Sequence, residues 1–428
     1  MSPSEPLRLK LLWLFLAVSA FVSFEPSPYE LMFAVCLLGF ARGGLAFDAS
    51  LAPLIVTLTA FDAAAAIALI PYTNEPDSVT FTFVTFYITL TTVLFAALVA
   101  TRPLQRMQAI RSGYTFAAML AAGLGLLGYF NIAGLSPYFT LYEGTRAMGP
   151  FKDPNVFAPF LVAPMGWLFQ DLLLQRGSFT SRVAMLVVLS AALFLSFSRG
   201  ALIDAVMTLT LVLGFTYLTT GSARLRGRTV ATALGCVAGV AILLAIALSV
   251  PSIREVALSR ATLVEDYDSG QQGRFGNQIR SIPMLLELPL GFGPVRFGKY
   301  FPFDPHEVFL SAFASFGWAG GIAFAAFVAM TLYTGFKIVF RRGATQHEFI
   351  GVFAAALPQL LQGVQIDTMH WRHLFMLFGC MYGLAAAERR GTRASGAAIA
   401  STDRRPRSDA SAEVAWRRHT GSAASPAP

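Results

Sequence analysis

Long runs of apolar residues dominate this chain and decide what it can fold into. Runs at 11–24, 79–100, 183–197 and 230–250 approach or exceed the ~20 residues that cross a ~30 Å hydrocarbon core. Hydrophobic residues make up 55% of the 428 positions and charged residues only 13%, which is too little charge to cover a soluble protein of this size. The sequence therefore predicts an all-α polytopic membrane protein.

About twelve membrane-length segments emerge when the chain is cut at these runs. The predicted spans are 8–24, 29–42, 50–71, 79–101, 113–134, 154–174, 182–198, 200–219, 229–250, 307–336, 349–365 and 373–388. The first run follows Arg8 and Lys10, as in a secretory signal. It lacks a clear small-residue cleavage site and many spans follow, so we expect an uncleaved first helix.

Basic residues predict the topology. With the N-terminus inside, all six inward turns are basic, whereas the short outward turns are acidic or neutral. We therefore expect both termini in the cytoplasm, and one long outer loop at 251–306 inside a membrane domain at 1–388. The tail at 389–428 is rich in Ala, Ser, Arg and Pro, which predicts a disordered basic cytoplasmic segment lying against anionic lipid.

The remaining compositional features exclude several classes of site. Much of the net charge of +8 falls in the inward loops and the tail, so we expect membrane lipids rather than nucleic acid as its partner. All three cysteines lie inside apolar runs, which argues against a disulfide framework. Asp62 lies near the middle of the third span and should pair with hydroxyls of the Thr-rich fourth span.

The first motif with chemical potential lies at 146–155, just before the sixth span. Asp153 and Asn155 can cap the helix that follows, and Arg146 and Lys152 are placed to meet an anion near the outer surface. A solvated basic loop is the plainer interpretation of the same residues.

The second motif, at 196–200, places Arg199 in a strongly apolar context between two predicted spans. An arginine fork can hold phosphate oxygens with two donors, and Ser196 and Ser198 can hydrogen-bond the same ligand. The alternative is an arginine that reaches the interface or pairs with Asp204.

The third motif is the long outer loop, which is too long to be a turn. It carries Arg274, Arg280 on a predicted amphipathic helix at 276–288, and His306 at its re-entry into the bilayer. A neutral imidazole there can accept a proton from a hydroxyl, although such a histidine is also a common polar anchor. The acidic run 265–268 could ligate a divalent cation, but a solvated acidic loop is the more frequent case.

The fourth motif precedes the last span. Asp367, His370 and Arg372 offer an acid, a base and a second phosphate fork, and His373 points into the span. The sequence has no metal-ligand spacing, no Gly-rich phosphate loop after a strand and no nucleophile elbow.

In their order, these motifs resemble the O-antigen ligase and O-antigen polymerase superfamily of bacterial envelope glycosyltransferases. The resemblance covers roughly 140–330 and extends through the predicted topology over most of the chain. Its pieces are Arg146-x-x-Gly-x-x-x-Asp-Pro-Asn155, Ser196-x-Ser-Arg-Gly200, Gly291-x-Gly293, Pro305-His306 and Gly317-x-x-Gly320.

The resemblance implies a periplasmic active site that acts on an undecaprenyl-pyrophosphate-linked glycan, without metal or cofactor and with inversion at the anomeric carbon. Arg199 with Arg274 or Arg280 would clamp the pyrophosphate, and His306 would serve or position the acceptor hydroxyl. The family often has Asn after the loop histidine, where this chain has Glu307. Glu307 would then either raise the basicity of His306 or act as the base itself.

Several functional alternatives stay open at this point. The acceptor could be lipid A-core, as in a ligase, or another lipid-linked repeat unit, as in a polymerase. The presence of a single sizeable outer loop favours the ligase slightly. A transporter or flippase for an anionic lipid-linked sugar would need polar groups running through the membrane, whereas here they gather at the outer rim. In a non-catalytic export partner, Arg199 and His306 would be dispensable.

Overall fold

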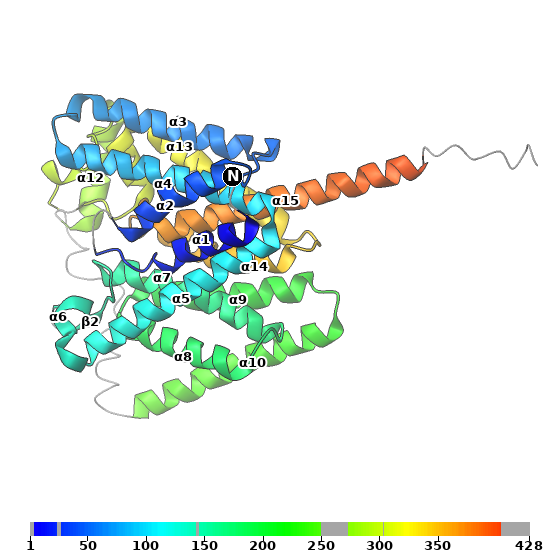
Figure 1. Cartoon of the computed structure of the whole chain (residues 1–428). Coiled ribbons are helices and arrows are strands. Elements are labelled where there is room, and N and C mark those ends of the chain that lie inside the picture. Colours follow the sequence, from blue (N-terminus) through cyan, green and yellow to red (C-terminus); the bar gives the residue numbers. More distant parts are fainter. Residues whose placement is uncertain (1–3, 24–26, 143–144, 250–272, 303, 404–428) are drawn as a thin grey trace, which may run out of the picture. The chain divides into compact units, whose positions relative to one another are not determined.

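The computed structural model describes residues 4–23, 27–142, 145–249, 273–302 and 304–403, and almost all of its regular structure is helical (Figure 1). The chain divides into two units, Met1–Ala387 and Glu388–Pro428. The structure does not describe residues 250–272, so the acidic run at 265–268 lies outside the described residues.

Each of the twelve predicted spans overlaps one helix in the part of the chain that the structure describes. These helices are α1 Glu5–Ala17, α2 Pro28–Ala41, α3 Ala52–Leu69, α4 Pro76–Thr101, α5 Pro103–Tyr129, α7 Pro154–Leu173, α8 Phe179–Leu195, α9 Arg199–Thr219, α10 Ala223–Ser249, α13 Val308–Val339, α14 Gln346–Gln362 and α15 Arg372–Asp403. By length and composition, α4, α5, α7, α9, α13 and the stretch Ala49–Tyr72 around α3 can cross a membrane, while α2 and α8 are shorter apolar helices. This is consistent with a polytopic all-α protein, and the twelve spans and their topology stay predictions.

Short elements connect the long helices. They are η1 Ala49–Leu51, η2 Ile70–Tyr72, η3 Ile132–Gly134, α6 Ser136–Phe139, α12 Arg274–Glu287 and η5 Phe297–Lys299. A hairpin of two short antiparallel strands, β1 Thr140–Leu141 and β2 Arg146–Ala147, was not predicted from the sequence. The amphipathic helix expected at 276–288 is α12. The last helix, α15, continues past the predicted domain boundary at 388 to Asp403, so the start of the predicted tail is helical here.

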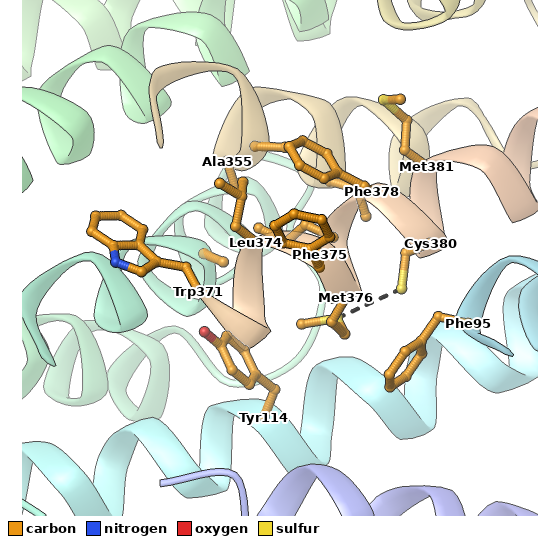
Figure 2. Close-up of a cluster of buried hydrophobic side chains, with 14 of the residues drawn as sticks. Phe95, Tyr114, Ala355, Trp371, Leu374, Phe375, Met376, Phe378, Cys380 and Met381 are labelled. Atoms are coloured by element: carbon orange, nitrogen blue, oxygen red, sulfur yellow. Dashed lines mark hydrogen bonds between the residues drawn. The ribbon is translucent and has the colours of Figure 1, made fainter. Parts of the chain in front are cut away.

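Small residues let several helices approach closely. A Cβ on Gly379 would lie 2.5 Å from the Thr92 carbonyl oxygen, and one on Gly383 would lie 2.7 Å from that of Ala96, so α15 packs directly on the backbone of α4. Figure 2 shows the apolar side of this contact, where Met376 and other side chains of α15 gather beside the ribbons of α4 and α5. Such close backbone contact is the usual role of small residues between membrane helices.

The helix that overlaps the fifth predicted span begins earlier than that span. The sequence placed Arg106 and Arg111 in an inner loop before residue 113, but α5 begins at Pro103 and includes both residues. Arg106 pairs with Glu5 at 3.2 Å, and Arg111 pairs with Asp171 at 2.9 Å and with Glu348 at 2.8 Å. Partners far away in the sequence neutralise these arginines, so the helix can carry them into the protein.

The predicted pairing of Asp62 is confirmed. The Thr89 hydroxyl donates to both carboxylate oxygens of Asp62, at 3.0 and 2.8 Å, and so joins α3 to α4. A carboxylate in an apolar span is costly unless it is hydrogen-bonded, which accounts for the threonine at this place in the fourth span.

A break in α13 holds the outer loop. Gly317 adopts φ 67° and ψ −167°, a conformation open essentially to glycine alone, and this frees carbonyl groups of the preceding turn. The Ala314 carbonyl accepts from the amides of Phe292 and Gly293, at 2.8 and 3.2 Å, and the amide of Trp318 donates to the Pro289 carbonyl at 2.9 Å. The Gly291-x-Gly293 and Gly317-x-x-Gly320 motifs therefore meet as one backbone junction.

The same loop is fixed on its other side by the turn between α3 and α4. Glu75 forms ion pairs with Arg296 and Lys299, and these cations hold the pKa of its carboxyl below the usual value. The Ser78 hydroxyl donates to the Pro294 carbonyl at 2.8 Å, and the Arg296 guanidinium lies over the Tyr72 ring. These two outer cations thus serve to dock the loop.

Candidate functional site

A cavity of about 930 Å³ is lined by five of the predicted site residues, which are Lys152, Asp153, Asp367, His370 and Arg372. Its other lining residues lie mainly on α1, α2, α4, α5 and α7 and at the start of α15. Aromatic side chains form much of its wall, including Tyr29, Phe81, Tyr87, Phe151, Phe160 and Trp371. Its charged and imidazole side chains are Glu30, Asp77, Lys152, Asp153, Asp367, His370, Arg372 and His373. Such a wall, mostly apolar with a few polar groups, is characteristic of a small-molecule site.

The turn between α14 and α15 supplies the fourth predicted motif as a group. Asp367 accepts a hydrogen bond from the Ser311 hydroxyl at 2.5 Å and one from the Met369 amide at 2.9 Å. Burial raises the pKa of the Asp367 carboxyl, and these two donors oppose that shift by stabilising the ionised form. His306 also lowers the pKa of Asp367 through its charge, so the loop histidine lies within electrostatic reach of this carboxyl.

His370 lies in the same turn and is neutral at physiological pH. It shares a hydrogen bond of 2.9 Å with the Thr85 hydroxyl, and its ring meets Phe81 edge-on. Burial lowers the pKa of His370 to about 4, and the charge of Arg372 acts in the same direction. A neutral imidazole in the wall can donate or accept a hydrogen bond with a ligand, but it supplies no positive charge.

Arg372 is already engaged by the protein. Its guanidinium forms an ion pair with Glu30 and donates to the Ser27 hydroxyl at 3.0 Å. Ser27 and Glu30 form a capping box at the start of α2, which holds the carboxylate in place. A pyrophosphate at Arg372 would therefore have to share the guanidinium with a carboxylate. The Ser27-x-x-Glu30 pattern was readable in the sequence as a helix start, although its link to Arg372 was not.

Some residues of the motif at 146–155 line the cavity, and others connect neighbouring elements of the fold. Asp153 caps α7 by accepting from the Asn155 amide at 2.7 Å, which confirms the predicted cap. Asp153 and the exposed Lys152 both line the cavity. Arg146 does not line it, because its guanidinium donates to the Ser196 carbonyl at 2.8 Å and to the Asn155 side-chain oxygen at 2.9 Å. This part of the motif ties the hairpin and α7 to the turn before α9.

The turn at 196–200 presents Arg199 at the first position of α9. Ser196 donates its hydroxyl to the Leu193 carbonyl at 2.6 Å and accepts from the Ser198 amide at 3.2 Å, so both serines shape the turn. Phe197 between them takes a left-handed backbone conformation, φ 51°. The Arg199 side chain is exposed and does not line the cavity. Of the second motif, the arginine is thus the group best placed to meet a ligand.

The outer-loop cations lie on α12. Arg274 is its first residue, and the exposed Arg280 donates to the Asn277 side-chain oxygen at 2.6 Å while lying over the Phe301 ring. Gln278 on the same helix donates to the Pro305 carbonyl at 2.5 Å. α12 is therefore tied directly to the turn that carries His306.

His306 and Glu307 have different structural roles. His306 is exposed and adopts a left-handed backbone conformation, φ 49°, which is uncommon outside glycine. Glu307 caps α13, because its two carboxylate oxygens accept from the amides of Phe309 and Leu310, at 2.9 and 2.6 Å. Burial raises the pKa of Glu307, and these amides oppose the shift. With both oxygens occupied, Glu307 serves to fix the turn and leaves His306 as the accessible imidazole.

Residues 184–325 match the family of O-antigen ligases, which is about a third of the chain. The matched segment runs from α8 through α9, α10 and α12 into α13, and so carries Arg199, Arg280 and His306. The resemblance to the O-antigen ligase and polymerase superfamily is confirmed over this segment. The cavity residues on α2, α4 and the turn at 366–371 lie outside it. No curated protein matches the chain.

Proposed function

We propose that this protein transfers a glycan from undecaprenyl pyrophosphate to an acceptor on the periplasmic face of the bacterial inner membrane. The match to O-antigen ligases supports glycan transfer in lipopolysaccharide or polysaccharide synthesis. The acceptor is lipid A-core or another lipid-linked repeat unit, and the single sizeable outer loop favours lipid A-core. The observation that carries the proposal is that the matched segment bears both Arg199 and His306, and that both side chains are exposed.

The chemistry follows from the properties of the donor. The acceptor hydroxyl oxygen attacks the anomeric carbon, the bond from that carbon to the pyrophosphate oxygen breaks, and undecaprenyl pyrophosphate leaves with the electron pair. Because pyrophosphate is a good leaving group, the main task is to neutralise its developing charge. The exposed Arg199 and Arg280 are suited to that task, with Arg274 at the start of α12.

His306 is the group we assign to the acceptor proton. Its imidazole is exposed. The backbone on either side of it is fixed, because Gln278 donates a hydrogen bond to the Pro305 carbonyl and the Glu307 side chain caps α13. Glu307 is a poor base in this arrangement, since proton uptake would disrupt the amide contacts that begin α13.

Complementation of a bacterial host that lacks its own ligase tests this proposal. Wild type, Arg199→Ala and His306→Ala are compared at matched expression, with Glu287→Gln as a control because Glu287 is an exposed carboxylate at the end of α12. The readouts are glycan attached to lipid A and the membrane face on which lipid-linked glycan accumulates.

We expect both alanine variants to lose glycan on lipid A and to accumulate lipid-linked glycan on the periplasmic face, while Glu287→Gln behaves as wild type. Full transfer by both alanine variants would refute the site. Glycan retained on the cytoplasmic face would instead identify a flippase for the lipid-linked sugar.

A further inference from the structure

The charge of the cavity wall does not suit a pyrophosphate. Four of its side chains are carboxylic acids, Glu30, Asp77, Asp153 and Asp367, while only Lys152 and Arg372 are basic. The guanidinium of Arg372 is already paired with Glu30. A doubly charged phosphate group placed here would face more carboxylates than cations. Like charges at close range cost several kcal/mol in a binding site.

Two buried polar atoms in the wall, the Tyr87 hydroxyl oxygen and one ring nitrogen of His373, have no hydrogen-bond partner within the described residues. His373 is 6% exposed, lines the cavity, and leaves its imidazole Nε2 without a hydrogen bond. The ring is held in place, stacked on Trp371 with centroids 5.4 Å apart and edge-on to Phe160 at 5.8 Å. A buried polar atom of this kind is expected to find a partner, and a ligand hydroxyl reaching the wall would supply one.

We propose that this cavity binds the sugar rings of the glycan, that it selects neutral or amino sugars over acidic ones, and that His373 Nε2 hydrogen-bonds a glycan hydroxyl. This inference rests on the proposed function and names the part of the substrate that the cavity takes. Sugar rings combine apolar faces, which pack on aromatic walls, with hydroxyls that donate to carboxylates. The wall offers both, with Phe81 and Tyr87 beside Asp77.

The polyprenyl chain of the donor is a poorer occupant. A hydrocarbon would leave His373 Nε2 unsatisfied and would strip water from the carboxylates without replacing their hydrogen bonds. The pyrophosphate then lies outside the cavity, against the exposed Arg199 and Arg280, which do not line it. The donor would thus be divided, with sugar rings inside and phosphates at the arginines.

Direct binding to the full chain in lipid nanodiscs tests the inference without requiring turnover. The probes are a neutral glucose trisaccharide, a glucosamine trisaccharide, a galacturonic acid trisaccharide and a sugar-free polyprenyl phosphate, each followed by saturation-transfer NMR and isothermal titration. The variants are His373→Phe, which keeps the aromatic ring but removes Nε2, and Asp77→Asn, which removes one exposed carboxylate. Glu287→Gln is the matched control for charge, because that exposed carboxylate does not line the cavity.

We expect the neutral and amino trisaccharides to bind at least about tenfold more tightly than the uronic acid trisaccharide, since like charges oppose the latter. His373→Phe should weaken neutral-sugar binding about two- to tenfold, the range for one hydrogen bond. Asp77→Asn should improve uronic acid binding, and Glu287→Gln should change neither.

Equal or tighter binding of the uronic acid trisaccharide overturns the inference, as does polyprenyl phosphate displacing the neutral sugar. A His373→Phe variant that binds the neutral sugar like wild type also overturns it. The proposed function fails separately. Sugar binding that depends on His373, in a protein that restores no glycan transfer in the deleted host, would refute the transferase and leave the ligand class standing.

Discussion

Replacing Gly317 by alanine should release the outer loop from α13. A Cβ at this position would clash with the Pro289 carbonyl oxygen and would lie 2.7 Å from the Leu290 Cα. The backbone conformation, φ 67° and ψ −167°, costs a residue with a side chain about 1–3 kcal/mol. Escape from it would break the three backbone hydrogen bonds made with Phe292, Gly293 and Trp318, each worth about 0.5–1.5 kcal/mol. Because the clash forces this escape, the three lost hydrogen bonds set an expected loss of stability of roughly 1.5–4.5 kcal/mol.

Thermal unfolding of the purified protein, combined with limited proteolysis, measures this effect. Gly214→Ala is the matched control, because Gly214 lies inside α9 with nothing within 4 Å of an added Cβ. We expect Gly317→Ala to melt at least about 3 °C below that control and to be cleaved within 289–302 under conditions that leave the control intact. Equal melting temperatures with an equally protected loop would refute the argument from the backbone junction.

Three further perturbations have expected outcomes. Arg111→Ala removes one of the two arginines that contact the half-buried Glu348 carboxylate, the other being Arg176, and should cost about 1.5–3 kcal/mol of stability. Glu348→Gln in the same chain should restore part of that loss in thermal unfolding. Folding lowers the pKa of His370 from 6.5 to about 4. Between pH 4 and pH 6.5, His370 therefore binds a proton more readily in the unfolded chain than in the folded one. Stability should then fall by up to about 3 kcal/mol as the pH drops from 6.5 to 4, and melting curves of His370→Gln should lack this slope. Arg146→Lys cannot reach both partners of the guanidinium, including the Asn155 side chain, and should lower stability by roughly 2 kcal/mol; unchanged melting would show that the fork is dispensable.

Much of the local structure could be predicted from the sequence because it depends on neighbouring residues. The apolar runs correspond to helices, and the amphipathic pattern at 276–288 corresponds to α12. Asp153 caps α7 as expected. The pairing of Asp62 with a threonine followed from the cost of an isolated carboxylate among apolar residues.

Contacts between distant parts of the chain could not be predicted. Arg111 was placed in a loop, whereas it lies in α5 and pairs with Glu348, 237 positions away. Arg372 was assigned to phosphate, and its guanidinium pairs with Glu30, 342 positions away. Charge spacing along the chain cannot reveal a partner supplied by another helix. The acidic character of the cavity wall was hidden for the same reason.

The arginine at position 111 also bears on how the chain is assembled during synthesis. Its helix, α5, emerges early, and Asp171 on α7 follows soon after, but Glu348 on α14 is made only near the end. Until then, Arg111 has Asp171 as its carboxylate partner, which Arg182 also contacts, and Arg176 still lacks Glu348. We therefore expect the order of insertion to matter, with the earlier helices packed before the last carboxylate of this cluster is made. Chains that end before Gln346 should then be less stable than the full chain, even though they contain Arg199 and His306.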